Sequence, residues 1–292
     1  MGKYFGTDGF RGEANVTLTV EDAYKVGRFL GWYYGQKTKA DRCRVVIGKD
    51  TRRSSYMFEY SLVSGLTASG ADVYLLHVTT TPSVSYVVRT EEFDCGIMIS
   101  ASHNPYYDNG IKVINGRGEK LEEETIEKIE SYLDGEMGEI PFAKRDAIGR
   151  TVDYAAGRNR YIGYLISLAT RSFKNMRVGL DCANGSASAI AKNVFDALGA
   201  ETHVINNTPD GLNINTNCGS TTSGDCRNMW LKIIWMLDLL MMEMRTAAWQ
   251  WIVRQAGGWR QDSLCMWKIH ERTGHAGQQY GCHHGYVELR SL

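Results

Sequence analysis

The sequence has little proline and no net charge. Only 4 of its 292 residues are proline, and 33 basic side chains balance 33 acidic ones. A dedicated nucleic-acid binder usually carries a basic excess, so we expect no nucleic-acid partner. The best candidate for a membrane span, Ile233 to Met242, is short and contains Asp238, so we expect no membrane partner. A hydrophobic content of 43% excludes wholesale disorder.

Several site-forming patterns are also missing. The seven cysteines show neither a CxxC motif nor zinc-like spacing, and the histidines form no cluster with metal spacing. The glycines form neither GxGxxG nor a Walker A motif, so a nucleotide cofactor is not indicated. The first residues lead into a polar, Gly-rich segment rather than an apolar leader. We therefore expect reduced thiols and a cytoplasmic protein.

The composition changes abruptly along the chain. Six of the seven tryptophans and six of the eleven methionines follow Ser223, and no proline does. The chain is therefore divided here into a first domain at 1–150, a partial second domain at 154–222, and a tail at 223–292. Residues 253–292 keep neither a helical nor a strand period for long, so we expect the tail to be poorly ordered.

Short apolar runs alternate with amphipathic stretches over the first 206 residues. This alternation predicts an α/β fold with mixed, mainly parallel sheets flanked by helices. Thr19 to Asp22 has the form of a capping box and predicts a helix start. Strands are predicted at 44–48, 72–78, 94–100, 177–183 and 201–206, and helices at 55–70, 82–91, 122–133, 154–172 and 187–198.

The sharpest chemical motif is Ile99-Ser-Ala-Ser-His-Asn-Pro105, which directly follows a predicted strand. Open α/β sheets bind ligands beyond the carboxyl ends of their strands. A serine here can carry a covalent phosphoryl group, and His103 beside it can act as an acid or base. The alternative is a polar turn in which Ser102 and Asn104 satisfy backbone groups.

Three other loops carry residues that suit phosphate. Phe5-Gly-Thr-Asp-Gly-Phe-Arg-Gly12 holds Arg11 between glycines, which permit close backbone approach; the alternative is a flexible N-terminus. Gly48 to Ser55 places Lys49 and Arg52 at a strand-to-helix turn, although a solvated basic loop is an equal alternative. The amide-rich segment 209–220 by itself indicates only a loop.

Together these motifs resemble those of the bacterial phosphoglucosamine mutases, a branch of the phosphohexomutase family. FGTDGFRG, GKDTR, ISASHNP, DNGIKV and PDGLNINTNCGS occur in this order, and the resemblance covers roughly residues 1–222. It implies two N-terminal domains of the phosphohexomutase architecture, the second incomplete. It also implies interconversion of glucosamine 6-phosphate and glucosamine 1-phosphate through a sugar bisphosphate. Phosphomannomutase or phosphoglucomutase activity is the alternative within the family.

The resemblance also assigns roles to residues. Ser102 matches the phosphoserine that donates and reclaims the phosphoryl group, and that phosphate would contact Mg²⁺. His103 and Lys112 match positions with roles in proton handling and charge stabilisation, and Arg11 matches an arginine near the phosphoserine. The predicted substrate- and phosphate-binding residues are Gly9, Lys49, Arg52 and Asn104.

The sequence departs from the family where its composition changes. The Asp-Gly-Asp-Ala-Asp-Arg loop that supplies three Mg²⁺ ligands in the family is absent. Met241-Met-Glu-Met244 requires the codons ATG-ATG-GAR-ATG, which read two nucleotides later give Asp-Gly-Asp or Asp-Gly-Asn. The codons that follow permit Ala-Asp-Arg. These matches predict a frameshift near Thr222. Residues 257–262, read one nucleotide later, permit Val-Asp-Gly-Asp-Lys-Ile, which predicts a second frameshift between about Val253 and Gly257.

The missing loop leaves three functional expectations open. The first is an enzyme of mutase descent that is inactive as written, because a phosphate on Ser102 would lack its metal. The second is a non-catalytic module that binds phosphorylated partners or pairs with a full-length mutase. The third is a chain without function.

Overall fold

The computed structural model describes residues 2–6, 8–219, 250–255 and 264–269. The helices are α1 (Val20–Gly35), α2 (Arg53–Ala68), α3 (Thr81–Thr90), α4 (Glu123–Leu133), α5 (Ala155–Ser167) and α6 (Ala191–Ala197). The strands are β1 (Phe5–Gly6), β2 (Gly9–Glu13), β3 (Arg44–Lys49), β4 (Asp72–Val78), β5 (Cys95–Ile99), β6 (Asp108–Asn115), β7 (Thr151–Asp153), β8 (Arg177–Asp181), β9 (Glu201–Ile205), β10 (Gln250–Gln255) and β11 (Leu264–Ile269).

Elements up to Asp153 form the first unit, which is built on a seven-stranded sheet of order β1-β2-β6-β5-β3-β4-β7. Strands β5, β3, β4 and β7 run parallel, while β6, β2 and β1 are added by antiparallel pairing. This confirms the predicted α/β class with a mixed sheet. The sequence analysis predicted β3, β4 and β5 but missed the antiparallel part and β7, which falls between the two predicted domains.

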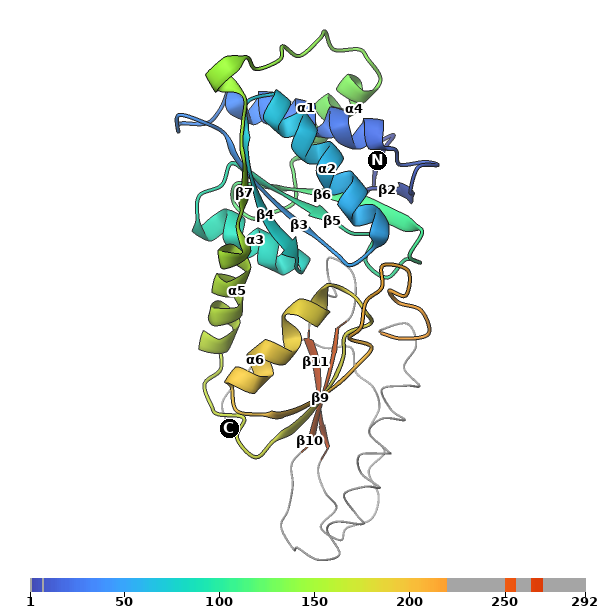
Figure 1. Ribbon diagram of the computed structural model, residues 1–292, viewed down its shortest axis with the longest axis vertical. Coiled ribbons are helices and arrows are strands. Elements are labelled where there is room, and N and C mark those ends of the chain that lie inside the picture. The colour runs from blue at the N-terminus through green and yellow to red at the C-terminus, as the bar shows by residue number, and fades with distance from the viewer. Residues whose placement is uncertain (1, 7, 220–249, 256–263, 270–292) are drawn as a thin grey trace, which may run out of the picture.

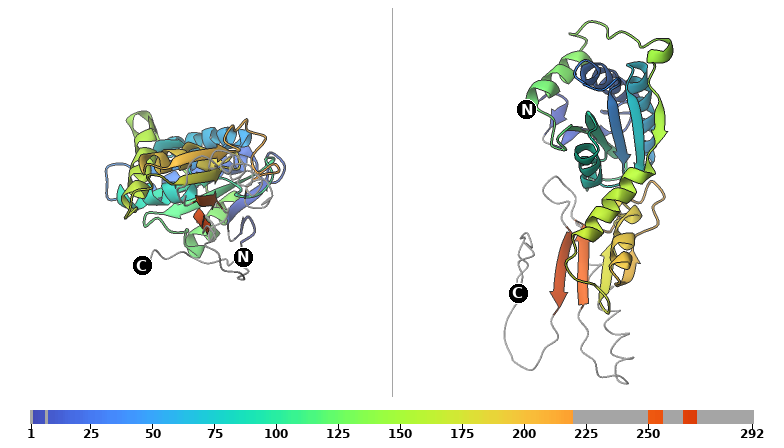
Figure 2. Two further views of the ribbon diagram at one scale, coloured as in Figure 1. Left: turned by 90° about the horizontal axis from the view of Figure 1, so that it is seen from below. Right: turned by 90° about the vertical axis from the view of Figure 1, so that its left-hand side faces the viewer.

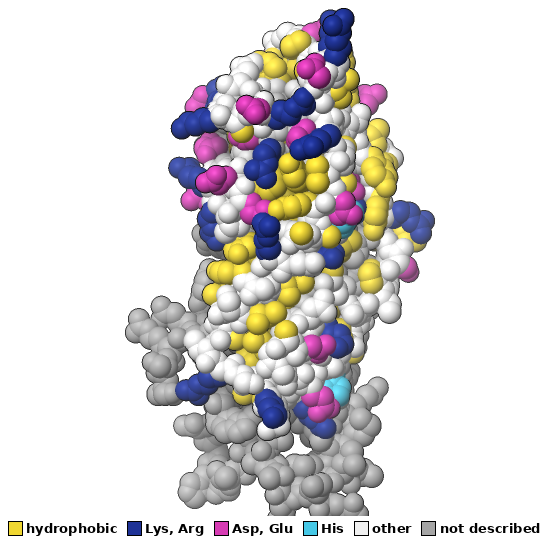
Figure 3. All heavy atoms as spheres, turned by 60° about the vertical axis from the view of Figure 1, so that its left-hand side comes forward, with side chains coloured by type: hydrophobic (Ala, Val, Ile, Leu, Met, Phe, Trp, Pro, Cys, Tyr) yellow, Lys and Arg dark blue, Asp and Glu magenta, His cyan; other side chains and the backbone are white. Residues whose placement is uncertain are grey.

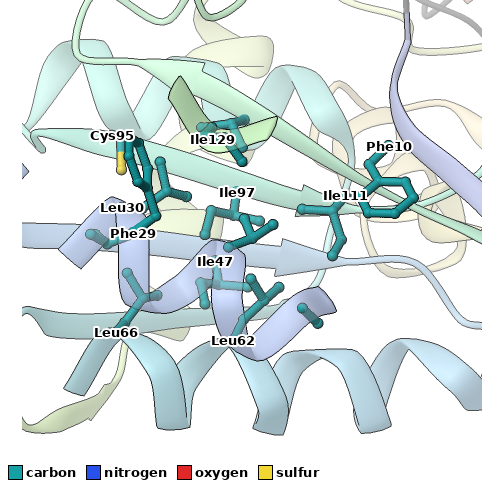
Figure 4. Packing of buried hydrophobic residues seen from close by; sticks show 14 of the residues in the cluster. Phe10, Phe29, Leu30, Ile47, Leu62, Leu66, Cys95, Ile97, Ile111 and Ile129 are labelled. Atoms are coloured by element: carbon teal, nitrogen blue, oxygen red, sulfur yellow. The ribbon is translucent and has the colours of Figure 1, made fainter. Parts of the chain in front are cut away.

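Strand alternation divides the hydrophobic core of the first unit between the two faces of the sheet. Ile47 and Ile97 lie in the cluster that contains α1, α2 and α4 residues, whereas Val46 and Met98 lie in the cluster with α3. Figure 4 shows the first cluster, in which Leu62 and Leu66 of α2 face the sheet residues. Burying both faces of β3 and β5 explains why these strands read as continuous apolar runs.

Helices α1 and α2 pack closely through a pair of glycines. A Cβ on Gly27 would lie 2.5 Å from the carbonyl oxygen of Leu62, and one on Gly65 would overlap the carbonyl oxygen of Tyr24. Helix α1 begins at the predicted capping box, because the Asp22 amide donates to Thr19 Oγ1 (3.2 Å) and the Thr19 amide donates to Asp22 Oδ2 (2.9 Å).

The second unit comprises α5, α6 and a four-stranded sheet of order β11-β10-β8-β9. Strand β10 runs parallel to β8, and β11 is antiparallel to β10. The sequence analysis expected the tail to be poorly ordered, and the part of the tail that the structure describes consists of β10 and β11. Strand β10 pairs with the edge of β8 opposite β9 and so satisfies backbone groups that would otherwise be unpaired. The remaining tail residues lie outside the described part, and so does the inferred first frameshift.

The two units lie end to end along the long axis, and α5 runs between them (Figures 1 and 2). Helix α5 packs on α3 of the first unit, where the Tyr86 and Tyr164 rings stack with centroids 4.5 Å apart. The predicted helix 187–198 is a short 3₁₀ turn at Ser186–Ala189 followed by α6.

The described surface carries both signs of charge. On the face in Figure 3, basic and acidic side chains are interspersed over the first unit. Within the described ranges, every helix is too short or too polar to cross a membrane. Cys43, Cys95, Cys182 and Cys218 are buried.

Candidate active site

The Ser-His-Asn loop leaves the carboxyl end of β5 as a tight turn. The Asn104 amide donates to the carbonyl of Ala101 (3.1 Å), and the Ser102 amide donates to Ser100 Oγ (3.0 Å). Ser102 adopts φ 55°, in the left-handed region that costs a non-glycine residue about 1 kcal/mol or more. Such an outlier at a strand end marks a residue whose orientation is fixed by its surroundings.

Two cations converge on the hydroxyl of Ser102. Arg11 Nη2 donates to Ser102 Oγ at 3.0 Å, and Lys112 Nζ donates at 2.9 Å. The antiparallel strands bring them there: Arg11 of β2 pairs with Gly110 of β6, and Lys112 of β6 pairs with Met98 of β5. The structure thus places Ser102, Lys112 and Arg11 together, as the sequence analysis expected.

The electrostatics around Ser102 favour an anion. Burial lowers the pKa of the Arg11 guanidinium, and Arg52 lowers it further, against the opposing influence of Asp8 and Asp108. Arg11 Nε is buried and has no hydrogen-bond partner among the described residues. A guanidinium remains charged under these conditions. A phosphate on Ser102 would supply acceptors to these donors.

Arg52 binds the backbone of the Ser-His-Asn loop. Its side chain is fully buried and pairs with the Asp50 carboxylate, while its Nη2 donates to the carbonyls of Asn104 (2.7 Å) and Ser102 (3.2 Å). Asp50 is held in turn by the hydroxyl of Ser55 (2.8 Å). The sequence analysis predicted that Arg52 binds phosphate, whereas in the structure its guanidinium binds Asp50 and two backbone carbonyls of the loop.

Lys49 also lies in a setting other than the predicted one. Its ammonium group is buried, pairs with the Glu59 carboxylate and lies 4.1 Å from the centroid of the Tyr56 ring. Burial of the Lys49 charge therefore depends on its carboxylate partner, since a buried charge is costly when it is unpaired. The sequence could not distinguish the two settings, because strand register decides which cation of this loop faces inward.

The remaining predicted residues lie on or beside the turn. His103 is exposed at the tip of the turn. The side-chain amide of Asn104, through Nδ2, donates to Asp108 Oδ2 (2.9 Å) and stabilises the turn. Gly9 adopts φ 95°, and a Cβ there would lie 2.5 Å from the Ile111 carbonyl oxygen, so it permits the close approach of β2 to β6. The structure therefore assigns Gly9 and Asn104 local structural contacts.

The second unit contributes a residue that the sequence analysis missed. Asn215 Nδ2 donates to the carbonyls of Ser102 (2.9 Å) and Asn104 (3.1 Å). Its loop follows β9 and returns to the first unit (Figure 1). Two further bonds anchor the contact: the Arg53 amide donates to the carbonyl of Gly211 (3.0 Å) and Thr51 Oγ1 donates to that of Asn184 (2.5 Å). The run of asparagines in this segment was the available signal.

The described residues do not fit the Mg²⁺ site that the resemblance implies. Across the part of the chain that the structure describes, no group of three or more acidic, histidine or cysteine side chains is positioned to hold a metal. The acidic residues beside Ser102 are already engaged, Asp8 with Arg11 (3.2 Å) and Asp108 with Asn104. We therefore derive no step through a metal from these residues.

Comparisons with known proteins agree with the fold and the loop. The family model described as phosphoglucomutase/phosphomannomutase, alpha/beta/alpha domain I, matches residues 2–138. Over 221 residues the chain is 76% identical to the phosphoglucosamine mutase of Lachnospira eligens and 51% identical to that of Streptococcus pneumoniae. Each alignment covers 76% of this chain and 49% of the relative, so the chain spans about half the length of these curated relatives.

Solved structures show the same architecture. A phosphoglucomutase/phosphomannomutase family protein from Burkholderia thailandensis aligns with a TM-score of 0.60 and 24% identity, covering 71% of this chain and 44% of that one. The parafusin phosphoglucomutase of Paramecium aligns with a TM-score of 0.54 and 20% identity, covering 72% and 44%. At these identities the likeness establishes the fold alone.

Fold and site together define an α/β domain of the phosphoglucomutase/phosphomannomutase type, with a serine loop at the carboxyl end of its central strands. Residues 2–138 match the phosphoglucomutase/phosphomannomutase domain I family, and the similarity of the chain to phosphoglucosamine mutases extends over 221 residues.

Proposed function

We propose that this chain carries the phosphoserine half of a phosphohexomutase active site, with glucosamine phosphates as the sugar substrates. The single observation that carries the proposal is the convergence of Arg11 and Lys112 on Ser102 Oγ at 3.0 and 2.9 Å. A neutral hydroxyl does not require two cations, whereas a phosphoryl group supplies oxygens for both. The high identity to phosphoglucosamine mutases supports glucosamine over mannose or glucose.

The proposed reaction transfers a phosphoryl group between Ser102 and a sugar hydroxyl. Ser102 Oγ forms a bond to phosphorus while the bond from phosphorus to the sugar oxygen breaks, and the serine proton passes to that oxygen. With a sugar bisphosphate as donor, this step leaves a sugar monophosphate and a phosphorylated Ser102. Transfer of that group to the free hydroxyl of a sugar monophosphate, followed by return to Ser102 of the phosphoryl group from the other position, completes an isomerisation. Arg11 and Lys112 stabilise charge on the transferring oxygens, and the exposed His103 is the proposed proton carrier.

Complete turnover requires more than this half-site. Phosphoryl transfer relies on positioning and on neutralisation of the phosphate charge, which in the family also involves Mg²⁺. The sequence lacks the Asp-Gly-Asp-Ala-Asp-Arg motif, so we propose that the 292-residue chain accepts a phosphoryl group at Ser102 without isomerising sugar phosphates. A full-length chain in the restored reading frame would bind Mg²⁺ and turn over, in the cytoplasm.

The test is phosphoryl uptake by the purified full chain. The chain is incubated with radiolabelled glucosamine or glucose 1,6-bisphosphate, and the rate of label incorporation is measured under saturating conditions. Arg11→Gln and Lys112→Met should each lower this rate about 10²-fold, the scale of losing one preorganised charge-stabilising group. Lys120→Met is the matched control, since Lys120 is an exposed lysine shortly after the same strand.

The outcome separates the open alternatives. The proposal is supported if label incorporation is absent in Ser102→Ala and slower in the Arg11 and Lys112 variants. Binding of sugar phosphate without any labelling of the wild-type chain would instead support the non-catalytic module. Equal rates for Lys112→Met and Lys120→Met would contradict the role assigned to Lys112.

A further inference from the structure

The carbonyls of Ser102 and Asn104 are held by donors from both units. Within the first unit, Arg52 Nη2 donates to both of them, and from the second unit Asn215 Nδ2 donates to the same two oxygens. Each oxygen therefore accepts two hydrogen bonds from side chains that are 163 residues apart in the sequence (215 − 52). Arg11 and Lys112, by contrast, donate to the side-chain oxygen of Ser102.

The Asn215 amide is itself held firmly. Asn215 adopts φ 59°, and its backbone amide donates to the carbonyl of Ala183 (2.9 Å), just after β8. Two neighbouring bonds between the units, from Thr51 and from the amide of Arg53, fix the same surface. The position of Asn215 thus reports whether the second unit is docked on the first.

We propose that Asn215 is a positioning residue that couples docking of the second unit to the conformation of the nucleophile loop. Ser102 adopts a left-handed backbone conformation, which is sterically unfavourable for a residue with a Cβ atom. Hydrogen bonds from other residues must therefore stabilise this conformation. Arg52 supplies one such restraint permanently. Asn215 supplies the second only while the second unit is in place, and it thereby aims Ser102 Oγ between Arg11 and Lys112.

This inference rests on the proposed function for its catalytic consequence, but its structural part is testable independently. A small misorientation of the reacting oxygen lowers the rate constant strongly, because the reacting atoms must approach in line. We therefore expect Asn215 to affect the rate of phosphoryl transfer while leaving the affinity for the sugar bisphosphate nearly unchanged.

The experiment compares Asn215→Ala with Asn213→Ala in the full chain. Asn213 is the matched control: it lies in the same loop, and its side-chain bonds reach only Thr208 and Asp210 within the second unit. Hydrogen–deuterium exchange of a peptide covering residues 101–108 should accelerate about tenfold in Asn215→Ala and change little in Asn213→Ala. The maximal rate constant of Ser102 phosphorylation by glucose 1,6-bisphosphate should fall about tenfold, with an unchanged half-saturating concentration.

The outcomes separate the role of Asn215 from the proposed function. Unchanged exchange at 101–108 in Asn215→Ala overturns the inference, and so does equal acceleration in Asn213→Ala, which would indicate general loosening of the loop. A raised half-saturating concentration with an unchanged maximal rate would also contradict it. Absence of phosphorylation in the wild-type chain would overturn the proposed function, and the exchange comparison would then decide the inference by itself.

Discussion

Removal of the Arg52 guanidinium is the most informative perturbation of the framework beneath the site. The substitution Arg52→Met keeps much of the buried side-chain volume and deletes the charge. The Asp50 carboxylate, only 1% exposed, then loses its ion-pair partner. The two carbonyls of the nucleophile loop lose one of their two donors.

The loss of stability in Arg52→Met depends on the hydrogen bonds that the Asp50 carboxylate keeps. Breaking a buried pair by removing one partner costs about 3–5 kcal/mol, because an uncompensated charge stays behind. Asp50 Oδ1 keeps the hydroxyl of Ser55 (2.8 Å) and the backbone amide of residue 52 (3.0 Å). We therefore expect the low end of that range, about 3 kcal/mol in the free energy of unfolding. The double variant Asp50→Asn/Arg52→Met should cost at least about 1 kcal/mol less than the sum of the single changes.

Urea unfolding followed by circular dichroism measures these values. Arg53→Met is the matched control, since its side chain is exposed on the same helix start and should change stability by about 0.5 kcal/mol or less. A loss below about 1 kcal/mol for Arg52→Met, or strict additivity with Asp50→Asn, would refute the reasoning.

Three further predictions concern stability and the gene. Glu130 lies partly buried, which raises its pKa, but amide donors from Phe5, Tyr4 and Lys3 outweigh burial and lower it below the ordinary value. Its stabilising contribution is therefore present above the unfolded-state pKa and lost as pH falls through the folded one; Glu130→Gln should flatten the acid side of the Tm–pH curve, and an unchanged curve contradicts this. Gly65→Ala should cost about 1–3 kcal/mol by overpacking against α1, whereas Gly163→Ala, with open space around it, should stabilise α5 by up to about 1 kcal/mol; thermal unfolding of both tests the helix contact, and equal shifts oppose it. Resequencing of codons 215–260 should give a reading frame that encodes Asp-Gly-Asp-Ala-Asp-Arg. If resequencing instead returns the present codons, the tail does not arise from a sequencing error.

The sequence predicted the parallel centre of the first unit well, because β3 and β5 are short apolar runs and α1 carries an explicit capping box. It failed at β2 and β6, since β2 is a Gly-rich segment that becomes a strand only by pairing with residues far along the chain. The same limit applies to the site. Local motif content identified Ser102, whereas the inward burial of Lys49 and Arg52 and the reach of Asn215 depend on register and on docking of the second unit.

The central claim is that Ser102 is the phosphoryl acceptor of this chain, and tandem mass spectrometry after incubation with a sugar 1,6-bisphosphate tests it most directly. The account predicts one added phosphoryl group, located on Ser102 and absent in Ser102→Ala. An unmodified Ser102, or a phosphoryl group on Ser100 instead, would contradict it.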